Sequence, residues 1–298
     1  MNQGSFTKEK SDFQSQGARC SGWLYRPEGT NRPAIVVMAH GFGAEADFGL
    51  PAFAERFAGR GLAVYLFDYR TFGASEGDPR YLINPRRQIR DWKAALAHVR
   101  SLPEINADRI AVFGSSYGGG HVISLAAQDP NIKAVVAQVP FVDGITSTIR
   151  TGTKHAVQGI LAGSRDLSRV LTLRKPYYVP IAGPPDVFAV LNTPDCEEGY
   201  LALVPEGSDW KNETPARAMI QLFLYRPTAK ASKVMCPALI IPGQRDSLIS
   251  PKAVEKAASR MREASLVQID AGHFDVYSGA LFEKVVEMEA DFLVSHLQ

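Results

Sequence analysis

A serine flanked symmetrically by glycines lies in the run Gly114-Ser-Ser-Tyr-Gly118. The pattern is Gly-x-Ser-x-Gly with Ser116 at its centre, after an apolar run expected to form a strand and before a stretch expected to form a helix. Only glycines let such a tight strand-to-helix turn close, and the turn would lift the Ser116 hydroxyl above the carboxyl end of the sheet. The helix N-terminus behind it would stabilise developing negative charge. Ser116 is therefore the predicted nucleophile, and Ser115, which lacks the symmetric flanks, is the alternative.

A serine hydroxyl is a poor nucleophile and needs a base, for which the chain offers six histidines. Only His273 lies in a loop just after a late predicted strand, in the run Asp270-Ala-Gly-His-Phe-Asp275. This loop is at the same carboxyl edge of the sheet as Ser116, so His273 is the predicted base. The other histidines are expected to have packing or solvated roles, with His155 retained as a minor candidate for substrate contact: His40, His98, His121, His155 and His296.

An imidazole base needs a carboxylate to orient it, and two aspartates follow predicted core strands. Asp246 ends the run Ile240-Ile-Pro-Gly-Gln-Arg-Asp246, and Asp143 lies in the exit from an earlier strand. The chain order Ser116, Asp246, His273 is the order that a nucleophile-elbow fold requires, so Asp246 is favoured over Asp143. An ordinary loop or cap aspartate is the alternative interpretation of Asp246.

A tetrahedral oxyanion needs two preorganised donors, and two backbone amides have suitable positions in the chain. One is the N–H of Tyr117, the residue after the predicted nucleophile. The other is the N–H of Phe42, in an early loop that reads Met38-Ala-His-Gly-Phe-Gly43 and whose glycines let the backbone curl. His40, beside this glycine turn, is expected to brace the loop rather than to act as a base.

A parallel sheet is expected to position these residues, because several short apolar runs are continuous rather than alternating. The runs predict strands at Ala34–Ala39, Leu62–Phe67, Arg109–Phe113, Ala134–Val139, Ala238–Ile241 and Leu266–Ile269. Helical periodicity predicts helices at Leu50–Arg60, Arg86–Leu102, His121–Gln128, Pro251–Arg262 and Leu281–Leu297. This alternation predicts an α/β fold with a mostly parallel sheet and helices on both faces. Asp12–Tyr25, with a turn at Gly17, predicts an antiparallel hairpin at the sheet edge.

The alternation is interrupted once, between residues 145 and 234. This stretch is too long for an ordinary connection, so it predicts a largely helical insertion over one end of a core formed by residues 1–144 and 235–298. Four of its aromatic side chains could line an apolar acyl pocket or could instead form the core of the insertion itself: Tyr177, Tyr178, Phe188 and Phe223.

The composition excludes several classes of protein. Lys plus Arg total 33 and Asp plus Glu total 31, and a net charge of +2 argues against a nucleic-acid partner or a polybasic membrane anchor. With 45% hydrophobic residues the chain is not globally disordered, and at 298 residues it can bury a large core. No membrane partner is expected, and the oligomeric state is left open, with a homodimer among the alternatives.

Three cysteines are too few and too scattered for a disulfide framework or a cysteine-based zinc site. Cys20, Cys196 and Cys236 are therefore expected to be reduced thiols. The segment Met1–Gln16 is polar, so no signal peptide is expected, and no apolar run has the length of a membrane helix. The expected location is the cytoplasm.

Five short runs together resemble the α/β-hydrolase superfamily, and within it the dienelactone-hydrolase-like and Xaa-Pro-dipeptidase-like serine hydrolases. The runs are His40-Gly-Phe-Gly43, Phe67-Asp-Tyr-Arg-Thr-Phe-Gly-Ala-Ser-Glu-Gly77, Gly114-Ser-Ser-Tyr-Gly118, Gly243-Gln-Arg-Asp246 and Gly272-His273. The resemblance covers residues 30–144 and 235–298, and no motif extends it to the insertion. It implies a Ser-His-Asp hydrolase with no metal and no organic cofactor, and it implies that the insertion is a cap over the active site.

The nucleophile separates this chain from some branches of the superfamily. Dienelactone hydrolases proper use a cysteine, and haloalkane dehalogenases and epoxide hydrolases use an aspartate, whereas this position holds Ser116. Lactone opening of the dienelactone type and the aspartate-dependent reactions are therefore not expected.

The predicted reaction is hydrolysis of a small-molecule carboxylic ester or thioester through an acyl-enzyme on Ser116. An acyltransferase or cyclising enzyme of secondary metabolism would use the same residues, with an amine or alcohol in place of water. A non-catalytic binding module is disfavoured because Ser116, Asp246 and His273 are all present. A peptidase is disfavoured because no acidic cluster is placed to hold a free peptide amine.

Overall fold

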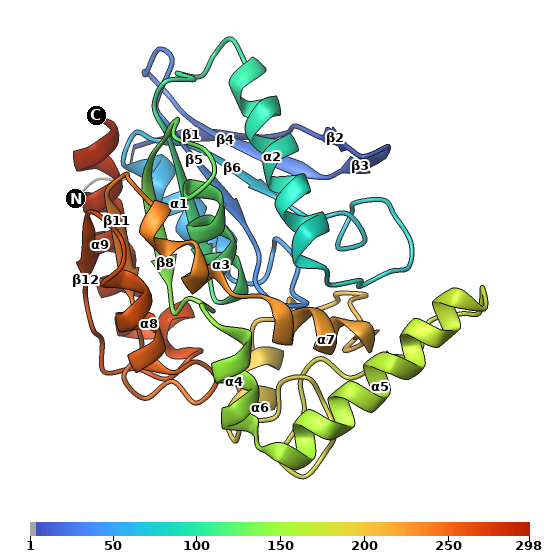
Figure 1. Ribbon diagram of the computed structural model, residues 1–298. Coiled ribbons are helices and arrows are strands. Elements are labelled where there is room, and N and C mark those ends of the chain that lie inside the picture. Colours follow the sequence, from blue (N-terminus) through green and yellow to red (C-terminus); the bar gives the residue numbers. More distant parts are fainter. Residues whose placement is uncertain (1–3) are drawn as a thin grey trace.

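The computed structural model describes residues 4–298, and its centre is an eight-stranded sheet (Figure 1). The strand order across the sheet is β1-β4-β6-β5-β7-β8-β11-β12. Their bounds are β1 Phe6–Lys10, β4 Gly22–Pro27, β5 Ile35–Ala39, β6 Ala63–Phe67, β7 Ile110–Ser115, β8 Ile132–Gln138, β11 Ala238–Ile241 and β12 Ala264–Leu266. Strand β4 runs antiparallel to β1 and β6, and every other neighbouring pair is parallel. The α/β fold with a mostly parallel sheet is thus confirmed.

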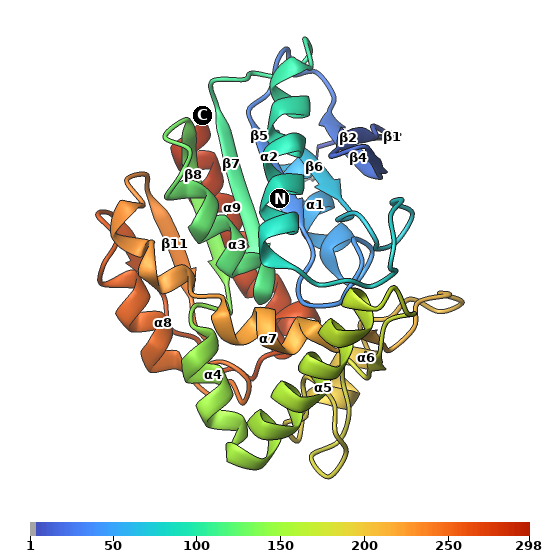
Figure 2. The same ribbon diagram turned by 45° about the vertical axis from the view of Figure 1, so that its right-hand side comes forward.

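Helices cover both faces of the sheet, which explains why the inner parallel strands are apolar at most positions. Helices α2 (Pro85–Ser101), α3 (Tyr117–Ala126) and α8 (Pro251–Ala258) contribute to the core on one face. Helices α1 (Leu50–Gly59) and α9 (Gly279–Leu297) contribute to the core on the other face, as the turned view in Figure 2 makes visible. All five expected helices are present, although α3 begins at Tyr117, directly after Ser116, rather than at His121.

Two expectations at the sheet edges need correction. The hairpin expected over Asp12–Tyr25 does turn at Gly17, but β2 (Phe13–Ser15) and β3 (Ala18–Cys20) form a separate two-stranded sheet. The edge of the main sheet is β1, whose exposed polar side chains gave no apolar run to detect. At the opposite edge, the last strand is β12 rather than Leu266–Ile269, because exposed edge residues pair by backbone and need no apolar pattern.

Residues 145–234 lie across the carboxyl ends of the strands, below the sheet in Figure 1. Helices α4 (Gly144–Thr151), α5 (Thr153–Leu171), α6 (Cys196–Leu201) and α7 (Arg217–Leu224) are joined by irregular stretches. The short strands β9 (Tyr178–Val179) and β10 (Thr214–Pro215) pair with each other. Residues 1–3, which the expected core range 1–144 includes, lie outside the described residues.

The three cysteines form no disulfide, in agreement with the expectation of reduced thiols. Burial raises the pKa of Cys20 to about 12 and that of Cys196 to about 11, so both remain protonated and unreactive near neutral pH. Within residues 4–298, no helix combines the length and the apolar character needed to cross a bilayer.

Candidate active site

Ser116 lies in the turn between β7 and α3, with φ +55° and ψ −122°. A β-carbon on Gly114 would overlap the carbonyl group of Gly118, and one on Gly118 would lie 3.0 Å from the Ala39 carbonyl oxygen. The glycine flanks are therefore required by the close approach of backbone segments. The Ser116 N–H donates to the Gln138 carbonyl at 2.9 Å, which ties the turn to the end of β8.

The imidazole of His273 bridges Ser116 and Asp246, three residues far apart in the sequence. Its Nε2 lies 2.9 Å from Ser116 Oγ, and its Nδ1 lies 2.7 Å from Asp246 Oδ2. A carboxylate only accepts, so Nδ1 carries the proton and Nε2 is left to accept from the serine hydroxyl. Both His273 and Asp246 are buried, so the contact between them is shielded from bulk solvent. The geometry can remove a proton from Ser116 and stabilise the imidazolium that results.

The loop that carries Asp246 leaves one carboxylate oxygen for the histidine. Asp246 Oδ1 accepts the N–H groups of Leu248 and Ile249, both at 2.8 Å, and Oδ2 faces His273. The rival acid, Asp143, instead caps α4 by accepting the Thr146 N–H at 3.0 Å. The other oxygen of Asp143 pairs with Arg226 at 2.8 Å. Asp143 therefore does not contact the imidazole, and the structure pairs His273 with Asp246.

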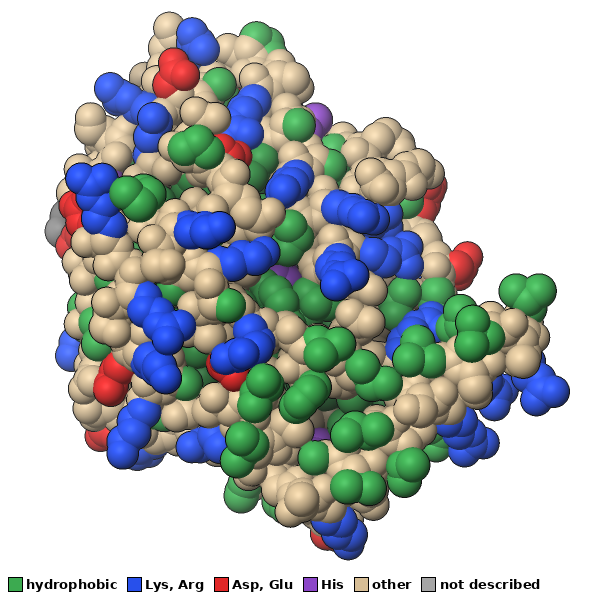
Figure 3. Space-filling view, viewed as in Figure 1, with side chains coloured by type: hydrophobic (Ala, Val, Ile, Leu, Met, Phe, Trp, Pro, Cys, Tyr) green, Lys and Arg blue, Asp and Glu red, His purple; other side chains and the backbone are tan. Residues whose placement is uncertain are grey.

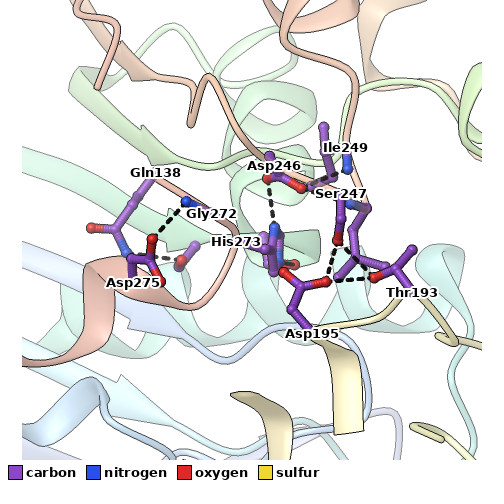
Figure 4. A network of polar contacts seen from close by, with 12 residues as sticks. Gln138, Thr193, Asp195, Asp246, Ser247, Ile249, Gly272, His273 and Asp275 are labelled. Carbon is purple, nitrogen blue, oxygen red and sulfur yellow. Dashed lines mark hydrogen bonds and ion pairs between the residues drawn. The ribbon is translucent and has the colours of Figure 1, made fainter. Parts of the chain in front are cut away.

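Residues of the 145–234 segment hold the Asp246 loop from outside, as the polar network in Figure 4 shows. The hydroxyl of Ser247 bonds to Thr193 Oγ1 at 2.7 Å and donates to the carboxylate of Asp195. From α4, the Arg150 guanidinium donates to the carbonyl oxygens of Asp246 and Ser247, each at 3.2 Å. Sequence reasoning missed this clamp, since these residues carry no motif and only Ser247 is adjacent to a predicted site residue.

The two predicted oxyanion donors lie in two segments that both approach the serine. Tyr117 is the first residue of α3, where an N–H has no intrahelical acceptor. Phe42 lies in the loop after β5, and that loop passes so close that a β-carbon on Gly41 would be 3.4 Å from Ser116 Cβ. Within residues 4–298, neither the Phe42 nor the Tyr117 N–H has a hydrogen-bond acceptor, so both can donate to a bound oxygen.

Two side chains of the 145–234 segment fix the loop that contains Phe42. Tyr200 donates its hydroxyl proton to the Phe42 carbonyl at 2.8 Å, and Trp210 Nε1 donates to the Gly43 carbonyl at 2.9 Å. Because their carbonyls are held, the peptide groups of this loop cannot rotate freely. Neither residue was among the sequence candidates, and no local pattern distinguishes them from other aromatics.

Three of the other histidines are held by hydrogen bonds within the chain. His40 donates from Nδ1 to the Gly41 carbonyl at 3.1 Å, and burial lowers its pKa to about 3, so it is a neutral brace as expected. Burial likewise lowers the pKa of His121 to about 3, and its Nδ1 accepts from the Tyr225 hydroxyl at 2.7 Å. His155 lines the main cavity, but its Nε2 already donates to the Ala189 carbonyl at 2.6 Å.

The alternative hydroxyl, Ser115, points away from the imidazole. Its Oγ is buried and accepts from the Tyr277 hydroxyl at 2.7 Å and from Gln138 Nε2 at 3.0 Å. These bonds anchor the residue beneath the turn, so Ser115 supports the position of Ser116 rather than replacing it.

A cavity of about 370 Å³ opens onto Ser116 beneath α4, α5 and α7. Its walls are mainly aliphatic and include Ile160, Val190, Leu191, Met219, Ile220 and Leu248. Of the four aromatics of the insertion that could line an acyl pocket or form its core, Phe223 lines this cavity. Tyr177 and Phe188 instead pack against the hydrophobic core, in line with the alternative that the sequence left open, and Tyr178 donates its hydroxyl proton to the Arg80 carbonyl at 3.3 Å.

A much smaller cavity, of about 30 Å³, lies on the other side of Ser116 and His273. Phe48, Leu203 and Phe274 are among its walls. The serine is therefore flanked by one large and one small apolar space. No acidic side chain lines the larger cavity, and no group of His, Cys, Asp and Glu within residues 4–298 is arranged to hold a metal ion.

Comparisons with known proteins identify relatives of this chain. Residues 30–177 match the family model described as serine aminopeptidase, S33. The chain is 39% identical over 281 residues to the quorum-quenching protein AidA of Acinetobacter baumannii. The aligned region covers 94% of this chain and 92% of that protein. It is 26% identical over 298 residues to the polyketide transferase af380 of Aspergillus fumigatus, covering 97% and 99% of the two chains.

Among solved structures, the α/β hydrolase GrgF from Penicillium superposes with a TM-score of 0.83 at 23% identity. The match covers 98% of this chain and 99% of that chain, and it establishes a common fold. The resemblance inferred from the five sequence runs is thus confirmed at the level of the superfamily.

Proposed function

Since the chain belongs to the α/β-hydrolase superfamily, we propose that it is a serine hydrolase that cleaves a carboxylic ester or thioester through an acyl-enzyme on Ser116. The observation that carries this proposal is the pair of contacts made by His273, 2.9 Å from Ser116 Oγ and 2.7 Å from Asp246 Oδ2. These distances are within the range for a nucleophile, a general base and an orienting carboxylate.

The acylation step follows from the positions of these atoms. As Ser116 Oγ attacks the substrate carbonyl carbon, His273 Nε2 takes the hydroxyl proton, and Asp246 stabilises the imidazolium. The free N–H groups of Phe42 and Tyr117 donate to the oxyanion, with the N-terminus of α3 adding positive potential. His273 then protonates the leaving alcohol or thiol as the tetrahedral intermediate collapses. A water molecule, deprotonated by His273, releases the acid and restores Ser116.

The two cavities beside Ser116 support a substrate with one large apolar group. The larger cavity, of about 370 Å³, has room for an aliphatic chain or a small ring system, whereas about 30 Å³ on the other side admits little more than a water molecule. We therefore propose a small-molecule ester or thioester whose bulky apolar part occupies the larger cavity.

Acyl transfer is the second candidate, because the same acyl-enzyme can be intercepted by an alcohol or amine. Two observations favour keeping it: a relative that spans the whole chain is named a polyketide transferase, and the cavity at Ser116 is apolar and lined by few polar atoms. A peptidase acting on a free N-terminus has less support, since none of the described residues places a carboxylate in the cavity wall to bind an ammonium group.

Covalent labelling with a fluorophosphonate probe tests the proposal. We expect the wild type to be labelled, Ser116→Ala to lose labelling, and the matched control Ser115→Ala to retain it. Labelling of a folded Ser116→Ala variant, or none of a folded wild type, would contradict an activated Ser116. With labelling established, product ratios in the presence of added alcohols and amines distinguish hydrolysis from acyl transfer.

A further inference from the structure

The outer face of helix α5 carries large aliphatic side chains that no other part of residues 4–298 covers. Val157 is 52% exposed, Leu161 65%, Leu167 40% and Leu171 85%. Figure 3 shows patches of apolar side chains, in green, over the part of the surface where α5 lies in Figure 1. A surface helix ordinarily turns such residues inward, so this face is the reverse of the usual pattern.

The inner face of α5 is already occupied by α7 and is made of small residues. A β-carbon on Gly159 would lie 2.7 Å from Met219 Cε, and one on Gly163 would lie 2.7 Å from Ile220 Cδ1. Asp166, on the same face, accepts the N–H groups of Tyr177 and Arg217. Because this packing is complete, α5 cannot rotate to bury its aliphatic face within its own chain.

The spacing of the exposed residues points to the occupant of this face. Residues 157, 161, 164, 167 and 171 are three or four apart, so they lie on one stripe of the helix. The intervals read 4-3-3-4, the same in both chain directions, with the exposed Ser164 at the centre. A two-fold axis through Ser164 would therefore place Val157 against Leu171 and Leu161 against Leu167. We propose that α5 pairs antiparallel with α5 of a second copy of this chain.

The distribution of charge favours a second copy over an anionic lipid surface. Two cations of α5 are tied to their own chain: Arg165 stacks 4.2 Å above the Tyr177 ring, and Arg169 Nε donates to the Lys175 carbonyl at 2.7 Å. Lys154 is exposed at the start of the helix, one turn before Val157. No charged side chain stands on the stripe itself, so two copies meet without like-charge repulsion at the contact. An anionic membrane would instead need those cations free to face the headgroups.

The same contact lies beside the entrance of the large cavity. Ile160 is 55% exposed and Leu224 is 64% exposed, and both line the cavity. A second copy on the α5 stripe therefore adds an apolar wall beside the opening that leads to Ser116. This consequence for substrate binding rests on the proposed function, whereas the pairing itself does not.

The mass of the protein in solution tests the pairing. By light scattering after size exclusion, we expect twice the chain mass of 32.5 kDa. Leu161→Glu combined with Leu167→Glu should raise the dissociation constant by about tenfold or more for each buried charge, whereas Met235→Glu, at a 54% exposed site elsewhere, should leave the dimer intact. A monomeric wild type, or a double variant that stays fully dimeric, would overturn the proposal.

Disulfide trapping tests the register. Ser164→Cys should form an interchain disulfide on mild oxidation, because the two-fold axis brings these residues within bonding distance. Lys154→Cys on the same helix should not form an interchain disulfide. Residue 154 lies ten residues from the two-fold axis on each chain, so the two thiols would be about 30 Å apart. Equal trapping at both positions would refute the antiparallel register.

Two further measurements keep the outcomes distinct. Binding of a monomeric wild type to phosphatidylglycerol vesicles would assign the stripe to a lipid surface and overturn pairing between copies. Fluorophosphonate labelling of the Leu161→Glu, Leu167→Glu variant should persist, because neither residue contacts Ser116. If the wild type is dimeric but unlabelled, the proposed function fails while the interface stands.

Discussion

Replacing Asp246 by asparagine should change how His273 is held while leaving the other hydrogen bonds of the Asp246 loop in place. The amide oxygen of Asn can still accept the N–H groups of Leu248 and Ile249, so the loop should keep its shape. The amide nitrogen then faces His273 and donates to Nδ1, which moves the imidazole proton to Nε2. In that tautomer Nε2 cannot accept the proton of Ser116.

The loss expected for Asp246→Asn is about 1,000- to 10,000-fold in kcat, or roughly 4–5.5 kcal/mol of transition-state stabilisation. Asp246→Ala would in addition leave the two loop N–H groups unpaired, at about 1–3 kcal/mol each in stability. Only the asparagine variant therefore isolates the chemistry, and its melting temperature should stay near that of the wild type.

Asp143→Asn is the matched control, because Asp143 is the other acid that follows a core strand. Asparagine caps a helix as well as aspartate does, so α4 should keep its start. The lost ion pair with Arg226, whose side chain is about half exposed, is worth less than about 1 kcal/mol.

Hydrolysis of a p-nitrophenyl ester gives kcat, and thermal unfolding followed by circular dichroism reports the fold. We expect Asp143→Asn to retain kcat within about threefold. The reasoning would be refuted if folded Asp246→Asn kept kcat within tenfold of the wild type, or if Asp143→Asn showed the larger loss.

Three further predictions concern the surroundings of the serine. Tyr200→Phe removes the bond to the Phe42 carbonyl and should lower kcat about tenfold with little change in KM; an unchanged kcat would mean that the loop does not need this bond. Ala156→Phe places a ring in the larger cavity and should lower kcat/KM for octanoyl esters at least about tenfold while acetyl esters change less than about threefold; equal losses for both would argue against acyl binding there. For His121, burial lowers the folded-state pKa to about 3, so the unfolded chain binds an extra proton below pH 6.5 and stability is lost as the pH falls from 6.5 toward 3. His121→Gln should reduce the slope of the unfolding free energy in urea titrations between pH 6 and 4, by at most about 1.4 kcal/mol per pH unit, and an unaltered slope would contradict a neutral buried imidazole.

The residues nearest the chemistry could be predicted because each depends on its immediate neighbours in sequence. Ser116 needs glycines on both sides of a turn, and His273 and Asp246 follow apolar runs that a parallel sheet must align. The carboxyl ends of such strands meet at one edge, so order along the chain was enough to bring the three together.

Other features could not be predicted, because they depend on contacts between distant segments. Strand β1 has polar exposed residues, and only its backbone pairing with β4 makes it a strand. The sequence shows that residues 145–234 contain aromatic side chains, but it does not show which of them face the cavity. Tyr177 packs under Arg165, Tyr178 donates to the Arg80 carbonyl and Phe188 lies against His155, which leaves only Phe223 at the cavity.

The 145–234 segment shapes the reactive loops as well as the substrate cavity. Tyr200 holds the Phe42 carbonyl, Trp210 holds the Gly43 carbonyl, and Arg150 holds the carbonyls of the Asp246 loop. All three donate to backbone oxygens of the core, so they fix peptide orientation rather than side-chain identity. Exchange of this segment between relatives should therefore alter kcat together with substrate preference. A segment that only covered the cavity would change preference alone.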